Sequence, residues 1–372
     1  MKILIVGAGA SGVVAAINYK RNHLNDEVFI IERLDSPLKK LLATGNGRCN
    51  LGNSKLDINN YSHPDFVKKI LDGYSYEEFF DSISIKTKLI DNLAYPVSES
   101  AVSVRNALLN ELDKLHIQIR LEEKLVDYEV SEKIKVITNK AVHVVDKLYL
   151  TGALNSSRNL GSDGSVLATL REHGYQIKEP LPGLCPIITK EDTKLVDGIR
   201  NKSKVYLYQN DKLIHEEKGE VLFKKNGLSG IVIYNISSLI ARSDKKATKI
   251  VLDLLPDYSK QEIQNYCKLH TFNGFLQGFF NPKLAQYLVK KFDQPKVLLS
   301  GVKHLEYTFK DFYGFDFSQV SVGGIKIDEV KDNLESKKEK GVYLLGELLD
   351  VDGPCGGYNL TWAFASALHA TK

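Results

Sequence analysis

The sequence has few cysteines, and their spacing suits neither pairing nor metal binding. Cys49, Cys185, Cys267 and Cys355 are the only four among 372 residues. None belongs to a C-x-x-C pair or to a Cys/His cluster with the spacing of zinc ligands. The sequence therefore predicts neither a disulfide scaffold nor a structural zinc site, and no metal is expected.

The chain also lacks a large excess of charge of either sign. The chain carries 50 Lys+Arg against 46 Asp+Glu, a formal net charge of +4. A protein whose main partner is nucleic acid usually carries a concentrated basic stretch. The charged run at 335–340 instead mixes both signs, which is typical of a solvated loop. We therefore expect a small-molecule substrate and no nucleic-acid partner.

A long uninterrupted apolar run is absent too. The uncharged stretch at residues 3–19 is crossed by three glycines and a serine, so it resembles neither a signal peptide nor a membrane span. We expect a cytoplasmic protein without a membrane partner, and its oligomeric state is not indicated. With 43% apolar residues and only 10 prolines, the composition is that of a globular protein.

The first fifty residues contain a nucleotide-binding pattern. An apolar run at 2–6 predicts a buried parallel strand, and Gly7, Gly9 and Gly12 then form G-x-G-x-x-G before a helical stretch at 13–20. Gly7 permits a tight turn, Gly9 lets the backbone approach a pyrophosphate, and Gly12 allows close helix packing. The N-terminus of the helix then faces the phosphates.

A second apolar run at 28–31 ends in Glu32, 20 residues after Gly12. A dinucleotide fold places at this distance the carboxylate that accepts hydrogen bonds from the adenosine ribose. The acid favours FAD or NAD over NADP and does not distinguish between the first two. The following stretch at 39–50 is rich in cations, glycines and amides, which suits a loop that wraps an anionic cofactor.

A second glycine-rich motif lies near the C-terminus. An apolar strand at 341–345 leads to Gly346 and Glu347, and the sequence D-G-P-C-G-G-Y-N at 352–359 precedes an apolar helix at 360–370. The N-terminus of such a helix can stabilise the negative charge of a reduced flavin.

In the middle of the chain, the pattern changes from a mixture of helices and strands to antiparallel strands. Helices are expected at 74–85 and 102–115, and strands at 117–121, 126–130, 134–138 and 142–150. Short alternating runs such as 204–208 and 220–223 then predict antiparallel β structure. A capping box at 259–262 and the pair Asn281-Pro282 predict at least two helices between 258 and 293, and a strand follows at 304–312.

The motifs G-A-G-A-S-G at 7–12, A-T-G-N-G-R-C-N at 43–50, and G-E-L-L-D-V-D-G and G-G-Y-N-L at 346–360 closely resemble those of the aminoacetone oxidase-like family of bacterial NAD(P)/FAD-dependent oxidoreductases, which includes bile-acid reductase-like members. The resemblance implies FAD. One departure concerns the residues before Gly227, where family members often carry Thr-His and this chain has Lys-Lys-Asn. A role for that histidine therefore cannot be transferred.

The resemblance also implies which residues contact the cofactor. The glycine fingerprint would hold the pyrophosphate, Glu32 the ribose, residues 44–50 the flavin end, Glu347 the ribityl chain and residues 356–360 the ring. The full expected set is Gly7, Gly9, Ala10, Ser11, Gly12, Glu32, Arg33, Lys40, Thr44, Gly45, Asn46, Arg48, Cys49, Asn50, Leu125, Val126, Thr151, Gly152, Gly346, Glu347, Gly356, Gly357, Tyr358, Asn359 and Leu360.

The expected fold is α/β, with a Rossmann-like FAD-binding domain of the two-dinucleotide-binding flavoprotein type interrupted by a β-barrel-like domain with a small helical insert. The expected boundaries are 1–188 and 320–372 for the FAD-binding domain, 189–257 and 300–319 for the β-rich domain, and 258–299 for the insert.

The expected activity is FAD-dependent hydride exchange between flavin N5 and a small organic substrate. Two directions stay open: oxidation of an amine with oxygen, and reduction of a conjugated double bond by NAD(P)H, for which no second fingerprint exists. The alternatives are a flavoprotein that acts on RNA and one that only senses. Catalytic residues are unassigned, with Arg48, Tyr358 and Asn359 the first to mutate; chemistry at Cys49 or Cys355 is a weaker hypothesis.

Overall fold

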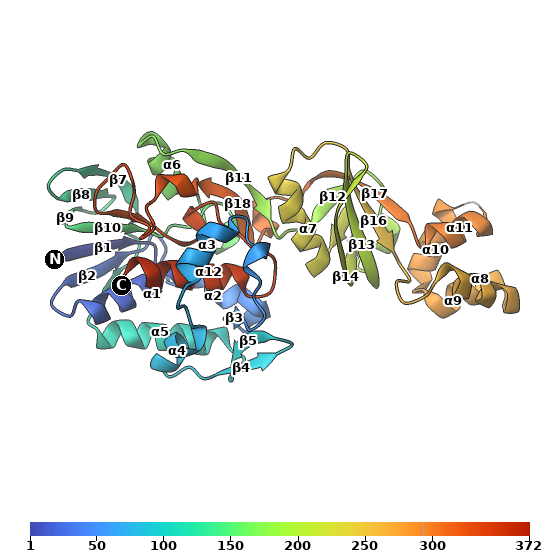
Figure 1. Cartoon of the computed structure of the whole chain (residues 1–372), viewed down its shortest axis with the longest axis horizontal. Coiled ribbons are helices and arrows are strands. Elements are labelled where there is room, and N and C mark those ends of the chain that lie inside the picture. Colours follow the sequence, from blue (N-terminus) through green and yellow to red (C-terminus); the bar gives the residue numbers. More distant parts are fainter. Residues whose placement is uncertain (293) are drawn as a thin grey trace. The chain divides into compact units, whose positions relative to one another are not determined.

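The chain divides into two compact units in the computed structural model, which describes residues 1–292 and 294–372. Unit 1 comprises Met1–Leu181 and Val320–Lys372, and unit 2 comprises Pro182–Gln319. The chain therefore leaves unit 1, builds unit 2 and returns to complete unit 1. The predicted α/β fold with an interrupted Rossmann-type domain is confirmed (Figure 1).

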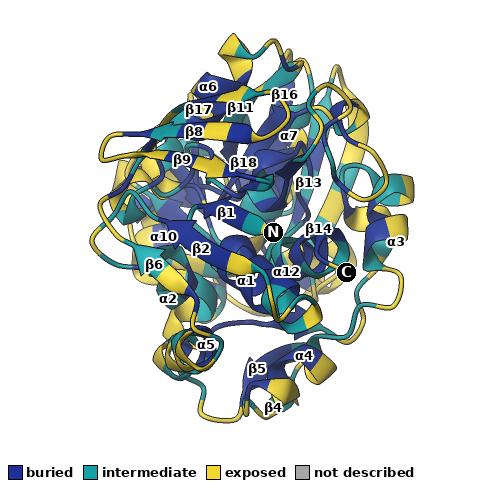
Figure 2. Cartoon of the chain, turned by 90° about the vertical axis from the view of Figure 1, so that its left-hand side faces the viewer, coloured by how far each residue is buried: buried dark blue, intermediate teal, exposed yellow. Residues whose placement is uncertain are grey.

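Unit 1 is built around a five-stranded sheet in the order β19-β10-β1-β2-β6, and every neighbouring pair is parallel. Because helices cover both faces of such a sheet, its inner strands β1, β2 and β10 are apolar after their first residue. Figure 2 shows β1 and β2 as buried. The strands are β1 (Lys2–Val6), β2 (Glu27–Ile31), β6 (Gln118–Arg120), β10 (Lys147–Leu150) and β19 (Val342–Leu344).

Helices from both ends of the chain pack together in unit 1. The first helix, α1, contacts the last, α12, and the Asn18 amide donates a hydrogen bond to Thr371 Oγ1 at 2.8 Å. The core therefore joins segments more than 300 residues apart in sequence. The helices are α1 (Ala10–Asn22), α2 (Lys39–Ala43), α3 (Pro64–Leu71), α4 (Tyr76–Ser82), α5 (Ala101–Lys114), α6 (Ser165–Glu172) and α12 (Tyr358–Ala370).

Three small sheets complete unit 1. One has the order β3-β5-β4, another the order β7-β8-β9, and the third pairs β11 with β18, the strands at which the chain leaves unit 1 and returns to it. Their bounds are β3 (Gly52–Asn53), β4 (Thr87–Ile90), β5 (Leu93–Pro96), β7 (Leu125–Val130), β8 (Ile134–Thr138), β9 (Val142–Val145), β11 (Ile177–Gly183) and β18 (Val320–Ile325).

Two local expectations are corrected by unit 1. Residues 142–150 form two strands, because Asp146 ends β9 and the chain then enters the parallel sheet as β10; the Asp146 carboxylate accepts a hydrogen bond from Lys2 N at 2.6 Å. The sequence pattern did not reveal this change of sheet, because both strands belong to one largely apolar run. The stretch at 39–43, expected as part of a loop, is the short helix α2.

Unit 2 contains a closed antiparallel barrel in the order β12-β15-β14-β13-β16-β17. Helix α7 (Ile231–Arg242) packs on β14. Closure removes free strand edges, which would otherwise invite pairing with other chains. The strands are β12 (Ile187–Thr189), β13 (Arg200–Gln209), β14 (Lys212–Lys224), β15 (Gly227–Ser229), β16 (Thr248–Asp253) and β17 (Leu305–Phe312).

A group of four helices is inserted between β16 and β17, within unit 2. Its ends lie close together, because Leu254 N donates a hydrogen bond to Val302 O at 2.8 Å. We call α8–α11 the helical lobe (Figure 1). Its helices are α8 (Lys260–Leu269), α9 (Phe272–Phe279), α10 (Pro282–Lys291) and α11 (Pro295–Gly301). None of the helices in the described part of the chain is both long and apolar enough to span a bilayer.

Candidate FAD-binding site

The carboxyl edge of the parallel sheet brings together residues from four separate parts of the sequence. Val6 lies in register with Ile31 and with Leu150, and Leu150 lies in register with Leu344. The residues that follow these strand ends are Gly7, Glu32, Thr151 and Leu345, and Gly346 comes next. Ligands of parallel α/β sheets bind at this edge.

The three fingerprint glycines have different surroundings. Gly7 has a φ of +101°, which disfavours any side chain there. A Cβ added to Gly12 would lie only 1.9 Å from Gly7 O, so this position lets the helix approach the strand. A Cβ on Gly9 would meet nothing within 4 Å, although Gly9 is the residue that caps α1. Open space therefore lies at the helix N-terminus, where phosphate binding is favoured.

Backbone donors fix the Glu32 carboxylate at the strand end. Ala8 N donates to one oxygen at 2.7 Å, and Leu34 N donates to the other at 2.9 Å. Each oxygen keeps a lone pair for a ribose hydroxyl. The neighbouring Arg33 forms an ion pair with Asp163 at 3.2 Å, so it ties the strand end to the turn after Gly161.

The loop at 44–50 has a strongly left-handed backbone. Gly45, Asn46, Gly47 and Cys49 all have φ between +57° and +81°. The Cys49 side chain is buried, and burial raises the pKa of its thiol to about 11. This thiol is therefore protonated at neutral pH, which counts against Cys49 as a nucleophile. The Arg48 guanidinium lies 4.7 Å from the centre of the Tyr95 ring and is 44% exposed.

Lys40 and Glu347, which are 307 residues apart, meet in an ion pair at 2.7 Å. The other Glu347 oxygen accepts hydrogen bonds from Ser321 N at 2.9 Å and from the Ser156 hydroxyl. Lys40 Nζ also donates to Ser156 Oγ at 2.7 Å. The carboxylate is therefore held by three donors. Ser156 and Ser321 were not predicted, because only the tertiary fold brings them to Glu347.

The C-terminal loop contacts the loop after the first motif. A Cβ on Gly357 would lie 2.6 Å from Gly52 O and 3.2 Å from Asn50 Oδ1. The Asn359 side chain closes its own loop, because Oδ1 accepts from Gly353 N at 3.0 Å and Nδ2 donates to Gly353 O at 2.8 Å. The two sequence motifs thus meet in one place.

The Tyr358 hydroxyl is also engaged by protein groups. It accepts hydrogen bonds from Asp57 N at 3.2 Å and from the Asn60 amide at 3.1 Å, and the Tyr358 ring is buried against that of Tyr61. Both Tyr358 and Asn359 therefore fix the start of α12. Of the three side chains chosen for mutation, only Arg48 is largely exposed.

The remaining expected residues lie at varied places. The Thr151 hydroxyl donates to Val6 O at 2.8 Å, and Gly152 packs closely on Val166. Leu125 is buried in the core, whereas Val126 is 54% exposed on β7. Ala10 and Leu360 are partly buried and pack on the core. The Thr44 hydroxyl donates a hydrogen bond to Leu41 O at 2.7 Å. Ser11 lies beside Gly346, and Gly356 lies near Leu93.

Two observations fit an FAD molecule at this edge. One is the open space beside Gly9. The other is Asn50 Oδ1, a buried acceptor without a partner among the described residues, in the loop expected beside the flavin. Buried acceptors are rarely left unpaired, so a donor from a ligand would satisfy this one. In the described part of the chain, no group of three or more His, Cys, Asp or Glu side chains could hold a metal ion.

The fold and the fingerprint define the class of protein as a Rossmann-type dinucleotide-binding protein, and its relatives make it an FAD-dependent oxidoreductase. Comparison with known families makes this specific: the chain belongs to the family described as HI0933-like protein Rossmann domain, whose model matches residues 1–372. The predicted family resemblance is therefore confirmed.

Two characterised relatives cover nearly the whole chain. The 3-dehydro-bile acid delta(4,6)-reductase of Clostridium scindens is 35% identical over all of this chain and 98% of its own length. The ribosomal RNA dihydrouridine synthase of Escherichia coli is 26% identical over 98% of this chain and 95% of its own length. Among solved structures, the 3-ketosteroid delta1-dehydrogenase of Sterolibacterium denitrificans shares the fold at a TM-score of 0.51 and 12% identity, covering 99% of this chain and 98% of that chain.

Proposed function

We propose that this protein uses FAD to transfer a hydride to a carbon–carbon double bond conjugated with a carbonyl group. The observation that carries the proposal is the relationship to two reductive enzymes. One is named for reducing delta(4,6) bonds of a 3-dehydro bile acid, and the other for making dihydrouridine, in which the uracil C5–C6 bond is saturated. Both names describe the same bond change on different molecules. Oxidation of an amine is the less supported direction.

FAD supplies hydride from N5 when it is reduced. The chain would hold its pyrophosphate with Gly9 and the N-terminus of α1, and its ribose with Glu32. Glu347, oriented by Lys40, Ser156 and Ser321, would hold the ribityl chain. The α12 N-terminus, fixed by Tyr358 and Asn359, would stabilise negative charge on the reduced ring.

Arg48 is the group that we assign to the substrate. It is the exposed cation of the loop at 44–50, and the Tyr95 ring and Glu99, at 3.7 Å, limit its movement. A cation at this position would stabilise the enolate oxygen that forms when hydride adds to a conjugated carbonyl compound. Arg48→Lys should keep the charge and lose the planar fork, whereas Arg48→Ala should lose both.

The proposal is tested by anaerobic spectroscopy of the purified holoprotein. NADPH and NADH are added separately, and bleaching of the flavin absorbance identifies a nicotinamide donor; dithionite serves as the donor if neither bleaches it. A 4,6-dien-3-one steroid is then added to the reduced protein. Reoxidation of the flavin is expected, together with a product two mass units heavier that has gained one hydride from the flavin and one proton from solvent. Purified protein that neither carries nor takes up FAD would refute the proposal.

A second candidate substrate is a uracil base in ribosomal RNA. The relationship to the dihydrouridine synthase supports it. Mass spectrometry of ribosomal RNA from a strain lacking this gene would test it. Loss of dihydrouridine, restored by the wild-type gene and not by an Arg48→Ala gene, is the expected result.

A further inference from the structure

The positive charge of the chain is concentrated in the helical lobe and the few residues that flank it. Residues 258–304 contain seven lysines and two acids, an excess of five, while the whole chain has a net charge of +4. Of the two acids, Glu262 is engaged in the cap of α8, where it accepts from Ser259 N at 2.7 Å. The lysines are Lys260, Lys268, Lys283, Lys290, Lys291, Lys296 and Lys303.

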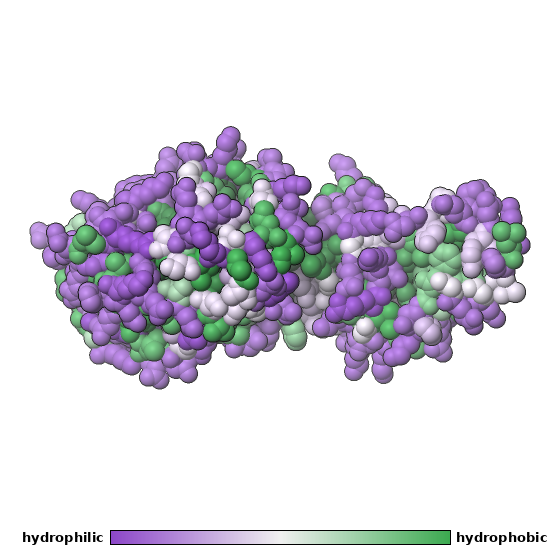
Figure 3. Space-filling view, turned by 90° about the horizontal axis from the view of Figure 1, so that it is seen from below, coloured by the Kyte–Doolittle hydropathy of each residue, from purple (hydrophilic) through white to green (hydrophobic). Residues whose placement is uncertain are grey.

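Only two of these lysines are engaged by groups of the barrel. Lys303 forms an ion pair with Asp253 at 2.6 Å, and Lys291 lies 4.7 Å from the centre of the Tyr307 ring. The other five have no ion-pair partner in the described part of the chain and are exposed. Their charge is therefore directed to solvent. Figure 3 shows hydrophilic side chains around this lobe, with pale and hydrophobic residues among them.

A groove of about 250 Å³ runs between α9 and α10 in this lobe. Three carboxamide side chains and no acid line it among the described residues: Asn273, Gln277 and Gln286. Lys283 and Lys290 stand three residues before and four residues after Gln286, so α10 presents all three on one face. The remaining lining residues are apolar: Leu276, Pro282, Ala285 and Val289.

We propose that the helical lobe is a docking surface for RNA. Lysines on an exposed helix face contact phosphates, and carboxamides both donate to and accept from base edges. An RNA partner suits both kinds of residue, because it offers phosphates to the lysines and base edges to the carboxamides. The inference rests on the second candidate substrate above, and it assigns recognition of that substrate to a part of the chain outside the FAD-binding residues.

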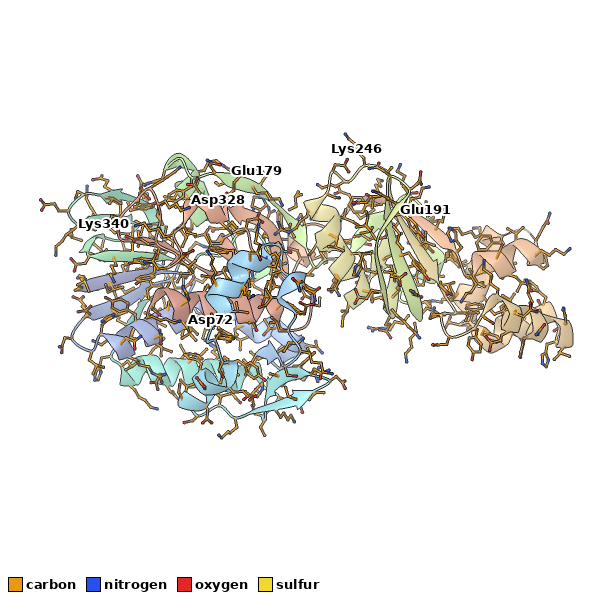
Figure 4. The ribbon with its side chains drawn as sticks, viewed as in Figure 1. Asp72, Glu179, Glu191, Lys246, Asp328 and Lys340 are labelled. Carbon is orange, nitrogen blue, oxygen red and sulfur yellow. The ribbon has the colours of Figure 1, made fainter. Side chains whose placement is uncertain are left out.

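The experiment measures fluorescence anisotropy of a labelled 30-nucleotide stem-loop RNA with a uridine-containing loop, titrated with the FAD-loaded protein in 50 to 200 mM KCl. The lobe variant is Lys283→Ala/Lys290→Ala/Lys296→Ala. The control variant removes the same charge from exposed positions elsewhere in unit 2, Lys194→Ala/Lys225→Ala/Lys246→Ala. Figure 4 shows Lys246 at the surface of unit 2.

The lobe variant should bind the RNA at least ten-fold more weakly at 100 mM KCl, and its log K against log salt slope should be shallower by about 2, since each lost phosphate contact removes about 0.7 to 0.9. The control variant should stay within about two-fold of the wild type. Equal binding by both variants would overturn the inference. So would wild-type protein that binds phosphatidylglycerol vesicles and not the RNA.

Flavin readouts separate this inference from the proposed function. Both variants should retain the flavin absorbance and the rate of reduction by dithionite, because no mutated residue lies in unit 1. Lobe-dependent RNA binding by a protein that saturates no double bond would refute the proposed function and leave the docking surface standing. Turnover of a dienone without lobe-dependent RNA binding would refute the docking surface and leave the proposed function standing.

Discussion

At the scale of single residues, the fingerprint glycines predict two different kinds of damage. Gly9→Val places a side chain in the open space beside the α1 N-terminus, and the φ of −83° at Gly9 allows valine there. We expect the melting temperature of the apoprotein to change little, while the Kd for FAD rises at least ten-fold, because the branched side chain occupies the space that a pyrophosphate needs. Flavin fluorescence titration measures the Kd.

Gly12→Ala is the matched variant. Its new methyl group would lie 1.9 Å from Gly7 O, so strand and helix must move apart. Overpacking of this kind costs about 1–3 kcal/mol, and we expect a lower melting temperature even without FAD. Equal effects of both variants on the apoprotein would contradict the distinction between open space and close packing.

His173 provides a prediction about pH. Burial lowers the pKa of His173, but hydrogen bonds to Asp127 at 2.9 Å and to Glu339 at 2.8 Å outweigh it and raise the pKa above its usual 6.5. The Tyr128 ring stacks on the imidazole, and the Tyr128 and Tyr175 hydroxyls donate to Glu339. The protonated ring is therefore favoured in the folded state.

Because the folded pKa is the higher one, protonation stabilises the fold fully below pH 6.5, and this contribution is lost as the pH rises through the folded pKa. We expect His173→Gln to lower the free energy of unfolding by about 1 kcal/mol more at pH 5.5 than at pH 9. Urea unfolding at both pH values measures it. His304→Gln, which removes an exposed pair with Glu306, is the control and should show almost no such difference.

At the scale of elements, the loop before α12 depends on one side chain. Asn359→Ala removes the amide that bridges Gly353 N and Gly353 O. We expect a loss of about 1–2 kcal/mol in unfolding free energy and weaker FAD binding, since the loop at 353–357 loses its fixed shape. Thermal melts with and without FAD test this. Asn359→Asp keeps only the acceptor, so its unfolding free energy should fall between those of the wild type and Asn359→Ala.

Strand ends and helix caps in both units could be predicted because each depends on a few neighbouring residues. The run at 2–6 followed by Gly7, and the capping box at Ser259, are local signals, and both elements form as expected. The contacts of Glu347 with Ser156 and Ser321 could not be predicted, because they join residues 191 and 26 positions apart. The same limit applies to Tyr358, whose hydroxyl is held by the distant segment at 57–60.

At the scale of the whole molecule, the expected cofactor residues all fall in unit 1, and the apolar core that joins α1, β1 and α12 also draws only on unit 1. The excess of positive charge lies instead in unit 2, which has 21 Lys+Arg against 15 Asp+Glu, while the rest of the chain has 29 against 31. Binding of the cofactor and contact with an anionic partner would therefore belong to different units.

This separation predicts that unit 1 binds FAD by itself. Leu181 and Val320 belong to strands β11 and β18, which are neighbours in one sheet, so a short Gly/Ser linker can replace residues 182–319. We expect the shortened protein to melt cooperatively and to bind FAD with a Kd within about three-fold of that of the full chain.

A smaller deletion isolates the contribution of the helical lobe. Leu254 N and Val302 O are hydrogen-bonded at 2.8 Å, so residues 258–301 can be replaced by a short linker while the barrel strands β16 and β17 stay paired. This protein should bind FAD and reduce the dienone as the full chain does, and bind the stem-loop RNA as weakly as the triple lysine variant.

The protein shortened to unit 1 tests the cofactor assignment. If it folds and fails to bind FAD, unit 2 supplies part of the cofactor site, and the assignment of all cofactor residues to unit 1 would then be wrong.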